Sequence, residues 1–276
     1  LLIFAGLFAS IFMGYNTAFV LGGLSMIFGW IFIGPEVFGF FIVRLEGVMK
    51  NYDLLAVPLF LFMGVYMEKA GVAERLYSAL YLLLGGLRGG LGISTITICA
   101  VFAAATGVVG ASEITIGLIA LPAMLSRNYN KSLVCGAICA GGTLGILIPP
   151  SVLIVIYGPL AGISVGKLFL GAIFPGILLA GLYVLYIAVR CYFRPEDGPP
   201  MPAEERMVPL RRKLYLLVTS VLPTAVLILS VLGSIFFGIA TPTEAGAVGA
   251  VGACILAAAT RRLDWPIVYG AGATPA

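Results

Sequence analysis

The chain has 276 residues, of which 61% are hydrophobic and only 10% are charged, and its mean hydropathy is +1.12. Soluble globular proteins have about 25% charged residues, so the composition excludes a soluble enzyme or binding domain and predicts an all-α protein that crosses a membrane several times. The formal net charge of +4 then concerns orientation in the membrane rather than nucleic-acid binding. The chain has no histidine, which removes the commonest metal ligand and general base.

The first third of the chain predicts a series of helices separated by turns. Gly14-Tyr15-Asn16 and Gly34-Pro35 have the composition of turns, and the residues between them form an apolar run. Charged residues within the later runs indicate helices that lie at the membrane surface. We expect the end of a longer helix at 1–13, a span at 17–33, an interfacial helix at 38–53, a short span at 54–67 and an amphipathic surface helix at 68–87.

Two apolar arms, 94–105 and 113–125, follow on either side of a small, glycine-bearing tip at 106–112. Each arm has about 12 residues and is therefore about 18 Å long as a helix. The hydrocarbon core of a bilayer is about 30 Å thick, so neither arm spans it alone. The pattern predicts a re-entrant hairpin over 92–125.

A broken helix is predicted next, over 133–165. Its apolar runs, 133–147 and 151–160, are separated by Pro149-Pro150. The two prolines have no N–H to donate, so the carbonyls of Gly145 and Ile146, four residues earlier, lose their helical partners. Unpaired backbone at membrane depth is tolerated where it is packed in protein or lines a polar cavity. A hairpin tip beside a broken helix is typical of the ion and substrate site of a transporter.

The remainder predicts spans at 168–189, 214–237 and 244–260 and a hydrophilic linker at 190–213. SIFMG at 10–14 is repeated as SIFFG at 234–238. We therefore interpret 1–189 as a first structural repeat, 190–213 as the linker and 214–276 as the incomplete start of a second repeat. Within the last part, Thr241-Pro242-Thr243-Glu244 has the spacing of a capping box at a helix N-terminus.

The basic residues predict the orientation. If the linker is cytoplasmic, all of the 16 lysines and arginines except Arg44, Lys50 and Lys167 lie on the cytoplasmic side. The turns at Gly14 and Gly238 then face opposite sides, so the two repeats have inverted topology. The same orientation makes the hairpin enter from the cytoplasm.

Five segments, in order along nearly the whole chain, resemble the large membrane subunit of tripartite ATP-independent periplasmic (TRAP) transporters. The resemblance implies an inverted-repeat, elevator-type ion/carboxylate transporter in the bacterial inner membrane. It also implies three partners: a small membrane subunit, a periplasmic binding protein and the organic acid that this protein delivers. The segments are VPLFLFMGVYMEKAG (57–71), GGLRGG (85–90), AATG (104–107), GGTLGILIPPS (141–151) and ATPTEAGAVG (240–249).

Carbonyl and hydroxyl oxygens at the tip and the break are the candidate ligands of a hard cation, which we expect to be Na⁺. Members of the family often have two serines after the Thr-Gly, whereas this chain has Val108 and Val109, which leaves only backbone carbonyls at those positions. The predicted ion-binding residues are Thr106, Gly107, Val108, Val109, Thr143, Gly145 and Ile146.

Because no arginine lies in the tip or the break, a substrate carboxylate is expected to meet backbone N–H groups at half-helix N-termini, hydroxyls or the missing second repeat. The predicted substrate-binding residues are Gly110, Ser112, Pro150 and Ser151. Glu113 is a possible titratable group, because a carboxylate at membrane depth is costly, although a position in the first turn of a helix also favours a plain dipole role. A tight turn between packed helices and a simple proline kink are the alternatives for the two motifs.

Competing functions remain open at this point. A proton-coupled transporter would use Glu113, and a non-transporting membrane subunit would need no site at all. An intramembrane enzyme would need a nucleophile–base pair, and a channel would need a charged pore stripe; the sequence has neither pattern. We expect the chain to be an N-terminal fragment, because it opens inside an apolar run without Met and its second repeat is incomplete.

Overall fold

The computed structural model describes residues 2–107, 109–202 and 209–259, and the regular elements in these ranges are helical. The chain divides after Asn51 into two compact units. The first contains α1 (Leu2–Phe12), α2 (Thr17–Ile33) and α3 (Glu36–Met49), with α2 packed against both neighbours. The side chain of Asn16 accepts a hydrogen bond from the N–H of Ala18 and so caps α2 at its predicted start.

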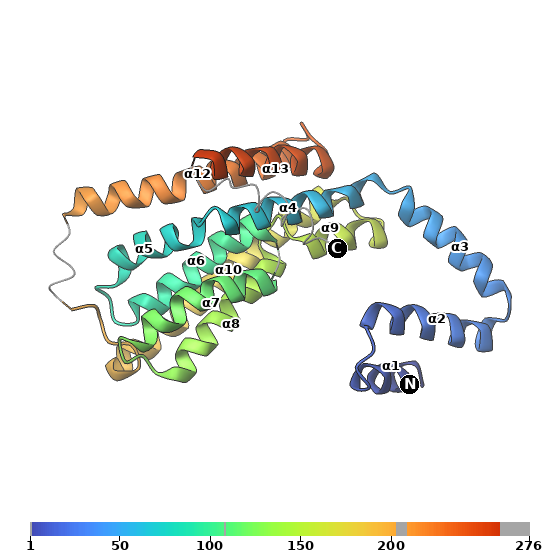
Figure 1. Cartoon of the computed structure of the whole chain (residues 1–276), viewed down its shortest axis with the longest axis horizontal. Coiled ribbons are helices and arrows are strands. Elements are labelled where there is room, and N and C mark those ends of the chain that lie inside the picture. The colour runs from blue at the N-terminus through green and yellow to red at the C-terminus, as the bar shows by residue number, and fades with distance from the viewer. Residues whose placement is uncertain (1, 108, 203–208, 260–276) are drawn as a thin grey trace. The chain divides into compact units, whose positions relative to one another are not determined.

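The second unit begins at Tyr52 and contains the hairpin, the broken helix and the long C-terminal helices (Figure 1). The all-α prediction is confirmed. Its elements are η1 (Tyr52–Leu55), α4 (Ala56–Lys69), α5 (Val72–Leu84), α6 (Gly90–Thr106), α7 (Val109–Leu125), α8 (Lys131–Leu147), α9 (Val152–Ala161), α10 (Val165–Phe193), η2 (Pro195–Asp197), α12 (Leu210–Phe236) and α13 (Pro242–Ala259).

Helix α6 lies at the centre of this unit. It packs against α4, α5, α7, α8, α10 and α12, while α13 lies along α4 (Figure 1). Its side chains are accordingly buried on several faces, as Ile96, Ile98, Cys99 and Phe102 show. Since α6 is the first arm of the hairpin, the hairpin forms the core of the unit rather than an appendage on it.

Four helical segments of the described residues are long and apolar enough to cross a membrane. They are 131–161, which is the broken helix α8–α9, and 165–193, 211–236 and 242–259. The hairpin helices α6 and α7 have 17 residues each and are therefore about 25 Å long, which is still shorter than the bilayer core. The prediction that neither arm spans alone stays a prediction.

Three predicted boundaries are wrong. The helix expected at 68–87 is two helices, because Gly71 is in the left-handed conformation with φ +68° and ends the turn between α4 and α5. The hairpin tip expected at 106–112 is shorter, because α7 already begins at Val109. The hydrophilic linker begins later, because α10 continues to Phe193.

The capping box that the sequence predicts is confirmed at the start of α13. The N–H of Thr241 donates to Oε2 of Glu244 at 2.7 Å, and the N–H of Glu244 donates to Oγ1 of Thr241 at 3.3 Å. The reciprocal pair satisfies two backbone donors at the end of the helix. Glu244 therefore acts as a cap.

Glycines set the spacing between the helices of the second unit. A Cβ at Gly141 of α8 would lie 2.5 Å from Sγ of Cys99 on α6, and one at Gly249 of α13 would lie 2.6 Å from Sδ of Met63 on α4. Apolar side chains gain little from helix association in lipid, so membrane helices associate largely through this kind of close packing. The glycine-rich composition is thus part of the fold.

Replacing Gly141 by alanine is expected to force α8 away from α6. Overpacking of this kind costs about 1–3 kcal/mol, so the thermal unfolding temperature of the purified protein in detergent should fall. Gly136→Ala is the matched control on the same helix, because a Cβ there meets no atom within 4 Å, and it should leave the unfolding temperature unchanged or raise it. Equal effects of the two variants would contradict this account of the packing.

Candidate functional site

The hairpin tip lies between the end of α6 at Thr106 and the start of α7 at Val109. Gly107 occupies it with φ +64°, a conformation that favours glycine. A Cβ at this position would also collide with the carbonyl oxygen of Pro150. Val108, predicted as an ion ligand, lies outside the described residues. The sequence therefore requires glycine at the tip for two independent reasons, its backbone conformation and its neighbour.

The tip touches the break in the next helix directly. The N–H of Val152 donates to the carbonyl of Gly107 at 3.4 Å, and Pro149 and Pro150 are buried beside it. Helix α8 ends at Leu147, just before the prolines, as their missing N–H groups dictate. The structure thus brings together the two motifs that the sequence places side by side.

Four helix ends converge where the tip meets the break. The C-terminal ends of α6 and α8 present carbonyl groups, and those of Gly145 and Ile146 receive no hydrogen bond from the prolines four residues later. The N-terminal ends of α7 and α9, at Val109 and Val152, present N–H groups. Carbonyl ends favour a cation and N–H ends favour an anion, so this junction suits an ion and a carboxylate together.

Ser151 is the most informative side chain at the junction. It is fully buried at the N-terminus of α9, and its hydroxyl makes no hydrogen bond to any described residue. Leaving a buried hydroxyl unpaired costs about 1–3 kcal/mol. An unpaired polar group at a junction of helix ends is a position where a ligand could supply the missing partner.

The hydroxyls of Thr106 and Ser112 close the tip from inside. They lie 3.0 Å apart, both are buried, and Thr106 also donates to the carbonyl of Phe102 at 3.1 Å. Ser112 and Gly110 both lie in the first turns of α7 rather than in the turn itself, and Gly110 is exposed. Both predicted tip hydroxyls therefore lie near the junction, but they are hydrogen-bonded to each other.

Two other predicted residues lie away from the tip. Thr143 is on the exposed side of α8, where its hydroxyl donates to the carbonyl of Ala140 at 2.7 Å and lies 3.5 Å from the hydroxyl of Tyr183 on α10. Glu113 is half-buried, and its side chain lies against Gly142 of α8. These contacts place Thr143 beside α10 and Glu113 on the contact between α7 and α8, and their predicted roles as ion ligand and titratable group stay predictions.

Helix α4 supports the tip in a way that the sequence analysis did not identify. A Cβ at Gly64 would lie 2.9 Å from both the Cα and the carbonyl oxygen of Thr106. Nearby, Oγ1 of Thr115 on α7 donates to Oε1 of Glu68 at 2.7 Å. The surface location expected for 68–87 is thus wrong at Glu68, which is half-buried against the hairpin, although Glu74 and Arg75 are exposed. In the sequence, the signal for this contact was Gly64, a small residue among the bulky residues of α4.

The base of the hairpin is held by the segment that was predicted to be a plain linker. The N–H of Gly89 donates to the carbonyl of Gly198 at 2.9 Å, and the N–H of Met201 donates to the carbonyl of Gly85 at 2.8 Å. Met201 is buried. Residues 194–201, called the base loop below, therefore pair with the chain that enters α6.

Asp197 is the centre of the base loop. Its backbone carbonyl accepts from the backbone N–H of Asn130 at 3.1 Å, and its Oδ1 accepts from the side-chain amide of Asn130 at 2.8 Å. Its Oδ2 accepts from Nε of Arg190 at 2.9 Å. These bonds connect α10, the base loop and the turn between α7 and α8. The Arg190 hydrogen bond, followed by that of Asn130, lowers the pKa of the Asp197 carboxyl below its ordinary value.

The lowered pKa predicts how stability depends on pH. The folded protein holds the ionised carboxylate, so the contribution of Asp197 is complete above about pH 4, the ordinary carboxyl pKa, and is lost as the pH falls through the lower folded value. Asp197→Asn should lower the unfolding temperature at neutral pH. As the pH is lowered, the unfolding temperature of this variant should fall less steeply than that of the wild type. Its exposed neighbour supplies the control, Glu196→Gln. Indistinguishable pH profiles for the two variants would exclude this role for Asp197.

Comparison with known proteins gives one consistent result. Residues 4–273 match the family model of the DctM component of tripartite ATP-independent periplasmic transporters. The chain is 39% identical over 204 residues, 73% of its length, to the C4-dicarboxylate TRAP transporter large permease protein DctM of Vibrio cholerae, and 37% identical over 232 residues, 83% of its length, to that of Pseudomonas aeruginosa. It is 31% identical over 216 residues, 78% of its length, to the ectoine large permease TeaC of Halomonas elongata. The chain spans about half the length of these relatives, at 43%, 52% and 48%.

Proposed function

Since the chain belongs to the DctM family of large TRAP transporter permeases, multi-pass proteins of the bacterial inner membrane, we propose that it forms part of a Na⁺-coupled importer of an organic acid. In this proposal the hairpin α6–α7 and the broken helix α8–α9 belong to the part that carries ion and substrate across the membrane. A small membrane subunit and a periplasmic binding protein that delivers the acid complete the transporter. A C4-dicarboxylate is the first substrate to test, because three relatives are named for it.

The observation that supports Na⁺ coupling is the unpaired hydroxyl of Ser151 among freed carbonyls. Na⁺ requires several oxygen ligands in place of its hydration shell, and the oxygens available are neutral. The donor set is the hydroxyl of Ser151, the carbonyls of Gly145 and Ile146, and the carbonyls at the tip. Neutral oxygens suit a monovalent cation better than a divalent one, because no carboxylate is needed to balance its charge.

The substrate carboxylate is assigned to the N-terminal ends of α7 and α9. Ser151 makes no side-chain cap bond to α9, and the N–H of Val152 donates to the carbonyl of Gly107, so the next N–H groups of that helix, at Leu153 and Ile154, are the ones proposed to meet a ligand. Anions are stabilised at such ends by the helix dipole and by the unpaired donors. An ion at the carbonyl ends and a carboxylate at the N–H ends would compensate each other's charge in one place.

Proton coupling through Glu113 is the second candidate. It is supported by the placement of this carboxylate, half-buried against Gly142 on the α7–α8 contact. The two mechanisms differ in their consequences. Labelled succinate uptake by the complete transporter in proteoliposomes should require Na⁺ and should persist in Glu113→Gln. Uptake that proceeds in Na⁺-free choline buffer, follows a pH gradient and disappears in Glu113→Gln would replace Na⁺ by H⁺ in the proposal.

The role of Ser151 has a separate test that does not depend on the substrate. Ser151→Ala removes no hydrogen bond among the described residues, so its unfolding temperature in choline chloride should equal or exceed that of the wild type. A bound ion stabilises the folded state by mass action, and the variant should lose most of the increase in unfolding temperature that NaCl produces.

Ser94→Ala is the matched control. Ser94 is also fully buried, but its hydroxyl donates to the carbonyls of Gly90 at 2.8 Å and Leu80 at 3.2 Å. This control should lower the unfolding temperature in both salts, by the equivalent of about 1 kcal/mol, and should keep the full response to NaCl. A Ser151→Ala protein that responds to NaCl as the wild type does would remove this hydroxyl from the ion site.

A further inference from the structure

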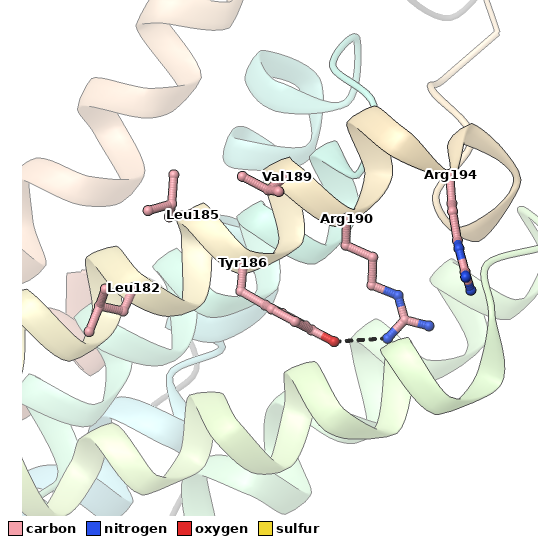
Figure 2. Close-up of a pocket in the computed structure, with 6 residues that line it drawn as sticks. All are labelled: Leu182, Leu185, Tyr186, Val189, Arg190 and Arg194. Carbon is pink, nitrogen blue, oxygen red and sulfur yellow. Dashed lines mark hydrogen bonds between the residues drawn. The ribbon is translucent and has the colours of Figure 1, made fainter.

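Two grooves meet at the C-terminal end of α10, outside the hairpin–break junction. The outer groove has a volume of about 580 Å³ and is lined by Leu182, Leu185, Tyr186, Val189, Arg190 and Arg194 (Figure 2). The inner slot has a volume of about 400 Å³ and lies between α8 and α10. Tyr186 and Arg190 line both, so the two spaces lie on either side of one tyrosine–arginine pair.

The walls of both spaces are apolar. In the outer groove, Leu182, Leu185 and Val189 follow one side of α10 and are about half exposed (Figure 2). In the inner slot, the buried side chains of Leu133 and Ile187 lie among small residues of α8. Gly136 is one of these, and a Cβ there would meet no atom within 4 Å. Two apolar spaces that meet at one end of an apolar helix long enough to cross a membrane offer one surface for each of two acyl chains.

Positive charge gathers where the spaces meet. Arg190 is held in place by Asp197, and its Nη1 donates to the hydroxyl of Tyr186 at 2.9 Å (Figure 2). Only two of the five N–H groups of its guanidinium are used in these bonds. Arg194, one helical turn further on, is exposed and its side chain has no hydrogen-bond or ion-pair partner among the described residues. Lys131 is exposed beside Ser132, which lines the inner slot.

The surroundings match the interface between lipid tails and headgroups. The span 165–193 ends at this point, and the exposed aromatic residues Tyr192 and Phe193 lie in its last turn. Tyrosine and other amphipathic aromatic side chains are enriched at this depth. Guanidinium groups bind phosphate through paired N–H donors.

We propose that the outer groove and the inner slot bind an anionic phospholipid. Its phosphate lies between Arg190 and Arg194, and its two acyl chains lie on either side of Tyr186. The site is independent of the ion and substrate junction, so it goes beyond the transport function. Because Arg190 also holds Asp197, the lipid headgroup would contact the same side chain that fixes the base loop to the hairpin.

Native mass spectrometry of the purified protein tests the charge requirement. Phosphatidylglycerol and phosphatidylethanolamine with identical acyl chains are added separately, and the lipid molecules that stay bound to each protein are counted. The wild type should retain phosphatidylglycerol preferentially. Arg194→Gln should weaken phosphatidylglycerol binding about fivefold, the factor expected for one cation close to an anionic lipid surface, and should leave phosphatidylethanolamine unchanged. Arg75→Gln is the control, because Arg75 is an exposed arginine on α5.

Gly136→Leu tests the acyl-chain requirement. It fills the inner slot without meeting a neighbouring atom through its Cβ and should weaken both lipids. Gly181→Leu is its control, because Gly181 is exposed on α10, has equally open surroundings and lines neither space. Equal retention of the two lipids by the wild type would overturn the proposal. So would an Arg194→Gln effect no larger than that of Arg75→Gln, or displacement of phosphatidylglycerol by millimolar inorganic phosphate, which would indicate a phosphate site.

Discussion

The approach of Gly107 to Pro150 is the contact on which the proposed site depends. No side chain fits between the hairpin tip and the carbonyl of Pro150, and the backbone of Gly107 has a positive φ. The tip can therefore reach the break, and the N–H of Val152 can donate to it. Without this approach the ends of four helices would lie apart, and the carbonyls freed by the prolines would face hydrocarbon, where unpaired polar groups are costly.

The hairpin is fixed at both of its ends by backbone contacts that involve glycines. At the tip, Gly64 of α4 lies against Thr106; at the base, Gly89 and Gly85 pair with the base loop. If the hairpin is re-entrant, as predicted, its inner end has no interfacial residues to hold it, and its position must come from protein contacts. The base loop supplies them from a segment that follows α10, about 70 residues after the hairpin ends at Leu125. Folding of the hairpin thus depends on residues that come later in the chain.

Much of the fold follows from hydropathy and from proline and glycine, because these signals are local. The start of α2 at Thr17, the end of α8 before Pro149 and the capping box at Glu244 were all predictable from short sequence patterns. The tip was predicted too long because Gly110 and Ser112 are small and polar, yet they continue a helix whose other residues favour it.

The contacts missed by sequence reasoning join residues far apart in the chain. Charge composition made 190–213 look like a solvated linker, although Asp197 and Met201 are buried against partners more than 60 residues earlier. Glu68 looked solvated for the same reason and is bound by Thr115. Thr143 was assigned to the junction because it precedes the break, but the helical period turns its side chain toward α10. Proximity in sequence does not determine which face of a helix a residue occupies.

The state of two side chains separates the mechanisms that remain possible for the junction. Glu113 packs against Gly142. Because α7 begins at Val109, Glu113 lies beyond the first turn, and the dipole role expected for it there is wrong. No packing or capping role explains a serine at position 151. Its buried hydroxyl has no partner in the described part of the chain and destabilises the protein, whereas alanine in its place would not. The cost is offset only if something binds there for part of the working cycle. A cation that takes neutral oxygens would supply such a partner, and a proton carried by a carboxylate on another helix would not, which is why we propose Na⁺ rather than H⁺ at this junction.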